Sequence, residues 1–269
     1  MKKITVILAG FVISCALKAQ SPAQAGKLRT IAGNYVSFSI DNLENIYLLS
    51  ATNQLKKLNA NGDSVSVFND IKKFGEVTLV DISNPVKILL FYKGFSTIAI
   101  LDGTLTLKNT IDLRRKNLFN VTAVGLSYDG NIWLYDEIAG NLKKMDDEGN
   151  VIFQTADFRQ LFDRAVMPTR IFDQSQYVYL CDSLQGIYVF DYYGSYKNRI
   201  DITRWNHLRI IDKYIYGSGS GNLYRYNITT FKYDEWPLPP VLQGYKQVLF
   251  KEKKIFALGP GGLDIFAVQ

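Results

Sequence analysis

The sequence predicts an all-β protein, because its residue types favour strands and its apolar residues alternate. Aromatic residues make up 13% of the 269 residues and include 17 Tyr and 16 Phe, which are enriched in β-strands. The apolar residues fall in short runs separated by Gly, Asn and Asp, as in strands joined by tight turns. An alternation with a period of two residues also excludes a helical solenoid.

One pattern occurs six times: a short apolar strand, a turn, and a second strand with two apolar residues spaced by three, often followed by Asp or Asn. The second strands begin at Leu55, Ile98, Leu142, Ile187, Leu223 and Leu263. Their period is close to the roughly 40 residues of a four-stranded propeller blade. Each unit has apolar faces that it cannot bury alone, so neighbouring units must stack. The sequence therefore predicts a six-bladed β-propeller with four-stranded blades, formed as a single domain by residues 27–269.

The strand pairs of the six units are expected, in chain order, at residues 46–49 with 55–59, 88–90 with 98–102, 132–135 with 142–146, 178–180 with 187–191, 215–216 with 223–227, and 255–258 with 263–266. The glycine-rich segments 217–221 and 259–262 are expected to be hairpin turns. The sixth unit lacks an outer strand after Phe266. Residues 27–32 have strand character, so we expect them to pair with the last blade and close the ring.

Residues 1–19 predict an export signal, because two lysines precede an apolar run that is too short to cross a bilayer as a helix. Two processing sites remain open: cleavage after Ala19, or a lipobox over residues 12–15 with a lipid on Cys15. We expect an exported protein in the periplasm or at the outer membrane of a Gram-negative bacterium, with membrane association only through a partner or that lipid. After the signal Cys181 is the single cysteine, which excludes an intramolecular disulfide.

The charge of the chain does not favour nucleic-acid binding. The formal net charge is +6, and Lys2, Lys3 and Lys18 of the predicted signal contribute half of it. The remaining excess of basic residues is too small to indicate a phosphate-binding surface.

The third unit resembles the NHL-type repeat of six-bladed propellers. Residues 129–133 read Asp-Gly-Asn-Ile-Trp, and residues 141–150 continue with an apolar strand and an acidic, Gly-containing turn. The units at 54–62 and 186–194 are similar. The resemblance extends over nearly all of the predicted mature chain, is clearest in the first, third and fourth units, and implies the propeller fold rather than one activity.

The sequence predicts no catalytic residue, no metal site and no cofactor. His207 is the single histidine, it is expected on a loop between the fourth and fifth units, and no nucleophile motif such as Gly-x-Ser-x-Gly accompanies it. Most acidic residues fall in the repeated turns, where Asp and Asn accept backbone hydrogen bonds. The alternative is that acids around the channel hold a divalent cation, as in enzymes of the gluconolactonase-like class.

The connections between blades carry residues that the repeat itself does not require. Loops that join the outer strand of one blade to the inner strand of the next emerge on one face of the ring, and Arg, Trp and aromatic residues supply much of the binding energy in interfaces. The candidate partner-binding residues are Arg114, Arg115, Phe158, Arg159, Phe162, Trp205 and Trp236. The alternative is that the aromatic residues close the blade ends and the arginines are solvated.

These observations favour a non-enzymatic interaction module that binds an envelope protein or protein complex. Small exported propellers of similar outline serve as accessory subunits of outer-membrane assembly or secretion complexes, including plug-like subunits of type IX translocons, which is an analogy of fold. The alternative is a propeller enzyme, such as a metal-dependent lactonase or a glycan-active hydrolase. A sensor that binds a small sugar is a third possibility.

Overall fold

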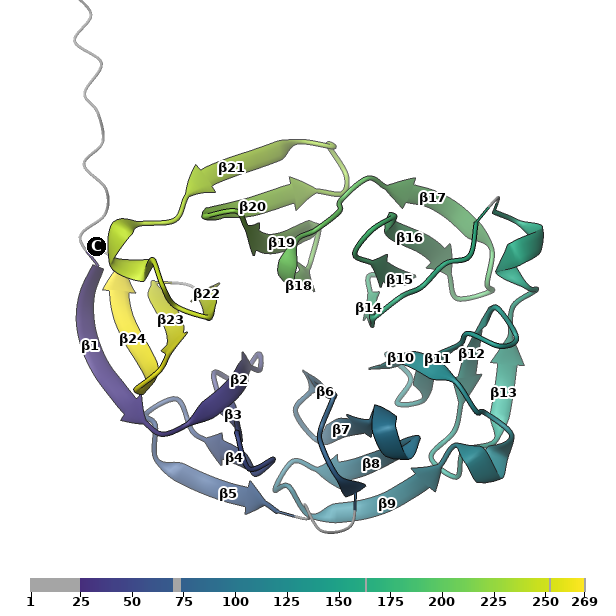
Figure 1. Cartoon of the computed structure of the whole chain (residues 1–269), viewed down its shortest axis with the longest axis horizontal. Helices are drawn as coiled ribbons and strands as arrows, with labels where there is room; N and C mark the ends of the chain where they lie inside the picture. Colours follow the sequence, from purple (N-terminus) through teal and green to yellow (C-terminus); the bar gives the residue numbers. More distant parts are fainter. Residues whose placement is uncertain (1–24, 70–73, 163, 252, 269) are drawn as a thin grey trace, which may run out of the picture.

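The computed structural model describes residues 25–268 apart from 70–73, 163 and 252. These residues form six four-stranded antiparallel sheets, arranged as blades around a common axis (Figure 1). The predicted six-bladed propeller is therefore confirmed. The predicted signal and its Cys15 lie outside the described residues.

Blade 1 consists of β2 (Tyr35–Ile40), β3 (Ile46–Ser50), β4 (Leu55–Leu58) and β5 (Ser64–Phe68). Blade 2 consists of β6 (Leu79–Asn84), β7 (Lys87–Tyr92), β8 (Thr97–Asp102) and β9 (Leu107–Asp112). Blade 3 consists of β10 (Val121–Leu126), β11 (Ile132–Asp136), β12 (Asn141–Met145) and β13 (Val151–Gln154).

Blade 4 consists of β14 (Arg170–Gln174), β15 (Tyr177–Asp182), β16 (Gly186–Asp191) and β17 (Tyr196–Ile200). Blade 5 consists of β18 (Asn206–Ile211), β19 (Tyr214–Gly219), β20 (Asn222–Asn227) and β21 (Tyr233–Pro237). Blade 6 consists of β22 (Gln247–Lys251), β23 (Lys254–Gly259), β24 (Gly262–Val268) and β1 (Ala25–Ala32).

Within each blade the strands follow one another from the axis to the rim, so β2, β6, β10, β14, β18 and β22 surround the axis (Figure 1). The strand pairs predicted from the repeat are the two middle strands of every blade. Among the described residues, four short 3-10 turns lie in the loops: η1 (Lys93–Phe95), η2 (Arg114–Lys116), η3 (Phe158–Gln160) and η4 (Pro240–Leu242).

The first strand closes the ring, as the sequence predicts. β1 pairs antiparallel with β24, from Ala25 opposite Val268 to Ala32 opposite Gly262. Gly262 has a φ of +133°, and a Cβ built there would lie 2.2 Å from the carbonyl oxygen of Ile31. Only glycine allows the two backbones to approach this closely.

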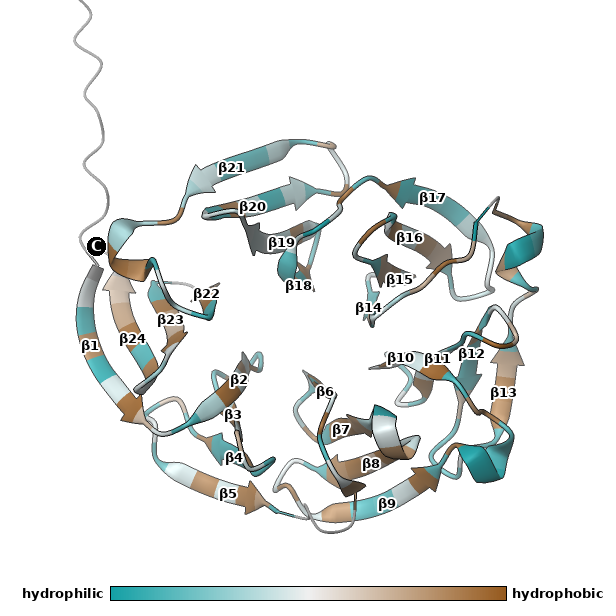
Figure 2. Cartoon of the chain, viewed as in Figure 1, coloured by the Kyte–Doolittle hydropathy of each residue, from teal (hydrophilic) through white to brown (hydrophobic). Residues whose placement is uncertain are grey.

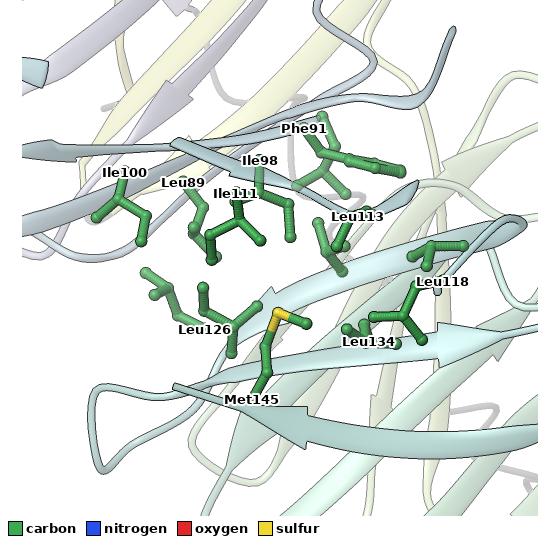
Figure 3. Close-up of a cluster of buried hydrophobic side chains, with 14 residues drawn as sticks. Leu89, Phe91, Ile98, Ile100, Ile111, Leu113, Leu118, Leu126, Leu134 and Met145 are labelled. Atoms are coloured by element: carbon green, nitrogen blue, oxygen red, sulfur yellow. The ribbon is translucent and has the colours of Figure 1, made fainter. Parts of the chain in front are cut away.

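Apolar side chains fill the joints between neighbouring blades. Figure 3 shows the joint of blades 2 and 3, where Ile98 and Ile100 of β8 point toward Leu134 of β11 and Met145 of β12. Similar clusters join blades 1 and 2, 3 and 4, 4 and 5, and 6 and 1. Burial of these faces stabilises the ring by roughly 25 cal/mol for each Å² of apolar surface removed from water.

The joint between blades 5 and 6 is different. The cluster at this joint consists of blade 6 residues and of residues 238–245 in the connection before blade 6, and includes no strand residue of blade 5 among those described. Asn227 is the one buried residue in β20. Figure 2 agrees, since β20 and β21 are mainly teal and white whereas β7 and β8 are largely brown. We call this joint the open seam.

Both predicted turns are shorter than expected. In blade 6, Gly259 and Gly262 belong to β23 and β24, and only Pro260 and Gly261 form the turn. In blade 5 the difference is larger. Residues 217–219 belong to β19, and the turn of this hairpin comprises only Ser220 and Gly221. The glycine at 217 has a packing role instead, because a Cβ there would lie 2.8 Å from the ring of Trp205.

Candidate functional site

Two kinds of loop meet on one face of the ring, which we call the junction face. Strands alternate in direction within a blade, so the connection into each blade and the turn between its second and third strands lie on the same side. On blades 2 to 4 these loops comprise residues 93–96, 113–120, 137–140, 157–167 and 183–185, apart from residue 163. We call this set the junction arc.

Hydrogen bonds link the first loops of the junction arc. The amide of Leu113 donates to the carbonyl of Ser96 at 2.8 Å, and Nε of Arg114 donates to the Ser96 hydroxyl at 3.3 Å. Further along, the amide of Glu137 donates to the carbonyl of Asn120 at 3.0 Å, and Nδ2 of Asn120 donates to Oε2 of Glu137 at 2.8 Å.

The later loops are linked in the same way. Nη2 of Arg159 donates to the carbonyl of Ile138 at 3.3 Å, and the amide of Phe158 donates to the carbonyl of Gly140 at 2.7 Å. Nε2 of Gln185 donates to the carbonyl of Ala165 at 2.6 Å. The loops of blades 2 to 4 are therefore held in fixed positions relative to one another.

Large apolar side chains project from the junction arc. Six of them are each more than half exposed: Phe95, Phe119, Ile138, Leu161, Met167 and Leu184. Single exposed apolar residues are normal, but a set of them on adjoining, hydrogen-bonded loops is typical of interaction surfaces.

All three predicted arginines lie on the same arc. Arg114, Arg115 and Arg159 are exposed. Arg115 pairs with Asp112 at 3.3 Å, and Arg159 pairs with Asp157 at 2.7 Å and through that hydrogen bond lowers the pKa of the Asp157 carboxyl. Arg114 donates to neutral oxygens, so its positive charge is not neutralised by an ion pair with a described residue.

The two predicted phenylalanines point into the protein. Phe158 is 1% exposed, and its ring stacks on Phe190 with centroids 4.6 Å apart. Phe162 packs on Tyr188 with centroids 4.9 Å apart. Phe158 begins the short turn η3, which is capped by Asp157, whose side chain accepts a hydrogen bond from the amide of Arg159.

The two predicted tryptophans do not join the exposed part of the arc. Trp205 lies in the connection between blades 4 and 5, partly buried, with its ring stacked on Tyr224 at 4.9 Å. Trp236 is expected in a connection but lies in β21, opposite Leu223. Its ring faces the Arg225 guanidinium at 5.1 Å.

Sequence reasoning overlooks the apolar residues in the turns of blades 3 and 4. The amides of Ile138 and Leu184 donate to Asp136 and Asp182 at 3.1 and 2.9 Å, and this turn geometry leaves the apolar side chains exposed. One sequence signal could have identified these two residues: each is apolar at a turn position where most other repeats have a polar or small residue.

His207 also differs from its predicted position. It lies in the inner strand β18, and not on a loop. By contrast, the acids follow the turn interpretation: Oδ1 of Asp146 accepts the amides of Glu148 and Asn150 at 3.1 and 2.7 Å. Within the part of the chain that the structure describes, no three His, Cys, Asp or Glu side chains are grouped so that they could hold a metal ion.

Solved structures with the same architecture have varied functions. Virginiamycin B lyase from Staphylococcus aureus is 12% identical, with a TM-score of 0.61, over 92% of this chain and 100% of that one. The Pan2 WD40 domain of Neurospora crassa is 9% identical, with a TM-score of 0.61, over 89% and 80%. The likeness shows the fold alone.

A third neighbour is the extracellular domain of a hybrid two-component system of B. thetaiotaomicron, 12% identical, with a TM-score of 0.56, over 87% of this chain and 33% of that one. No protein-family model and no curated protein matches the sequence, so the NHL-type resemblance stays a prediction. Among the described residues, no helix has the length and apolar character needed to cross a membrane.

Proposed function

We propose that this chain is an exported, non-enzymatic interaction module at the envelope of a Gram-negative bacterium, and that its junction arc binds a protein partner. The observation that supports this proposal is the arc itself, where exposed Arg114 and Arg115 lie on loops that also expose Phe95 and Phe119. The setting suggested by the predicted signal and by analogy of fold is an outer-membrane secretion or assembly complex, plug-like as in a type IX translocon.

The arc favours a partner segment that combines acidic and apolar residues. Exposed apolar side chains provide area that a partner can desolvate, and guanidinium groups bind carboxylates through paired, charge-assisted hydrogen bonds. The loops are already fixed by hydrogen bonds, so little conformational entropy is lost when the partner binds. Catalysis has no comparable support among the described residues, because acids such as Asp146 cap turns and acids such as Asp136 form ion pairs.

Site-specific photo-crosslinking in the native envelope tests the proposal. A photo-crosslinking amino acid is placed at Phe119 or Ile138 on the junction face, and for matched controls at Val86 or Tyr193, which are as exposed but lie in turns on the opposite face. We expect both junction-face positions to cross-link to the same protein and both controls to leave that product absent.

The partner identified in this way is then used as the probe. Arg114→Ala combined with Arg115→Ala should weaken its binding about thirtyfold, the effect of losing roughly 2 kcal/mol at an interface hot spot. Equal cross-linking from both faces, or chelator-sensitive turnover of a lactone or glycoside by a protein whose arc variants behave like wild type, would contradict the proposal.

A further inference from the structure

Three cationic or potentially cationic side chains lie near the axis on adjacent inner strands. Arg170 is the first residue of β14, and His207 and Arg209 belong to β18. The two strands are neighbours in space. The positive charge of Arg170 acts on both Arg209 and His207. The position is separate from the junction arc, which consists of loops.

The two arginines of this group lack a hydrogen-bonded or ion-paired carboxylate among the described residues. No hydrogen bond or ion pair joins Arg170 or Arg209 to a residue that the structure describes. Asp81 of β6 is the carboxylate whose charge acts on Arg170, but its oxygens already accept the amides of Ser83 at 2.8 Å and Leu126 at 2.7 Å.

A second arginine in blade 5, Arg225, is paired with a carboxylate and serves as a comparison for Arg209. Arg209, Tyr216, Arg225 and Asp234 stand opposite one another across all four strands of blade 5. Arg225 makes a two-nitrogen contact with Asp234, with Nη2 at 2.8 Å and Nε at 3.1 Å from the same oxygen. Arg209 lies in the same row without such a carboxylate.

Placing these positive charges close together and partly away from water costs electrostatic free energy. Arg209 is half-buried and Arg170 is exposed to solvent, yet protein surrounds both near the axis. Burial and the charge of Arg170 lower the pKa of Arg209 to about 10. Burial, with repulsion from Arg170, Arg209 and Lys246, also lowers the pKa of His207. An anion placed here would relieve both effects.

The backbone of β18 contributes to the arrangement. Its pairing with β19 shifts between Asn206 and Arg209, and His207 has a φ of +54°, which is uncommon for a residue with a Cβ. Nε2 of His207 lies 3.0 Å from the carbonyl oxygen of Lys246. Irregularities of this kind in a strand redirect side chains and occur preferentially next to binding sites.

We propose that Arg170, Arg209 and His207 form a binding site for a small-molecule oxyanion, that is, the carboxylate or phosphate group of a soluble ligand. Planar guanidinium groups suit either oxyanion because they donate two parallel hydrogen bonds. The site goes beyond the proposed partner-binding function, since it uses none of the residues of the junction arc.

The chain provides a direct probe, because His207 is its single histidine. Ring-labelled histidine therefore gives one set of imidazole NMR signals, which reports on this site alone. The mature protein is titrated with sodium phosphate and, separately, with sodium glucuronate, each against sodium chloride at equal ionic strength. We expect a saturable shift with at least one oxyanion and a rise in the pKa of His207 at saturation.

Variants then assign the effect to the arginines. Arg209→Gln and Arg170→Gln should each raise the dissociation constant about tenfold or more, the effect of losing one charge-assisted hydrogen bond. Arg225→Gln, in the same cross-strand row, is the matched control and should bind as wild type. Oxyanion should raise the melting temperature of the wild type and of Arg225→Gln, and hardly that of the other two variants.

The response to each oxyanion also identifies the preferred group. Saturation by phosphate alone assigns a phosphorylated ligand, and saturation by glucuronate alone assigns a carboxylate. Shifts that chloride reproduces at equal ionic strength, no saturation with either oxyanion, or unchanged affinity in both Arg170→Gln and Arg209→Gln would each overturn the proposal.

Discussion

Thr30 in the first strand and Asp264 in the last are joined by a hydrogen bond of 2.5 Å between Oγ1 and Oδ1. The same carboxylate pairs with Nζ of Lys27 at 2.7 Å and accepts a hydrogen bond from the hydroxyl of Tyr245. One side chain therefore connects the first strand, the last strand and the connection that precedes blade 6.

Replacement of this carboxylate should weaken ring closure in a pH-dependent way. Burial raises the pKa of Asp264, but the bonds from Lys27, Thr30 and Tyr245 outweigh it, and the net pKa lies below the usual value. A carboxyl with a lowered folded pKa stabilises the native state above its unfolded pKa of about 4, and this contribution disappears as the pH falls through the folded pKa.

We therefore expect Asp264→Asn to reduce the free energy of unfolding by about 1–3 kcal/mol at pH 7, and by less below about pH 4. Urea unfolding of the wild type and the variant across this pH range measures the difference. Glu148→Gln, in an exposed turn, is the control and should have little effect. An equal deficit at acidic and neutral pH would show that the ionised carboxylate is not what stabilises the joint.

Buried and exposed residues among the predicted partner-binding set should differ in their contribution to stability. Phe158→Ala removes a ring that is stacked in the core and should cost about 3–5 kcal/mol of stability. Arg114→Ala combined with Arg115→Ala alters only exposed side chains and should change stability by less than about 1 kcal/mol. Thermal or urea unfolding gives both values, and similar costs for the two proteins would contradict the assignment of Phe158 to the core.

Cys181 should be unreactive in the native protein. It is fully buried, and burial raises the pKa of its thiol to about 12, so almost no thiolate forms at neutral pH. In protein that begins at Gln20, a maleimide should label Cys181 only at the rate at which the fold opens, and urea should accelerate labelling. Rapid stoichiometric labelling in buffer would show that this part of blade 4 opens easily.

The mature N-terminus distinguishes the two predicted processing sites. If the lipobox is used, mass spectrometry should find a chain that begins at acylated Cys15, and Cys15→Ala should prevent lipidation. If the ordinary signal peptidase acts, the chain should begin at Gln20 and carry no lipid. The first result would place the protein on a membrane by its own anchor, and the second would leave association to a partner.

The fold could be predicted because the sequence pattern of a blade is local and recurs in every repeat. A pair of apolar strands such as β11 and β12, which are close in sequence, identifies a blade wherever it recurs, and the excess strand before the first repeat predicts closure by β1. The row from Arg209 to Asp234 could not be predicted, because it depends on the register of four strands and on one irregularity at His207.

The binding residues were harder to predict than the fold, for a physical reason. Aromatic residues in connections serve equally well as contacts and as core, and only the packing of Phe158 on Phe190 decides between the two roles. Ile138 and Leu184 were overlooked because their turns belong to the repeat, and an apolar residue in such a turn is recognised only by comparison with the polar or small residues at the equivalent positions of other repeats.

The open seam means that apolar packing between neighbouring blades is not the same all around the ring. Five joints are held by apolar residues from both sheets, whereas blade 6 covers its face toward blade 5 with its own connection. Local opening is easiest where elements share the least apolar packing, so we expect the ring to open first between blades 5 and 6. The pairing of β1 with β24 lies within blade 6, so an opening between blades 5 and 6 would leave this pairing intact.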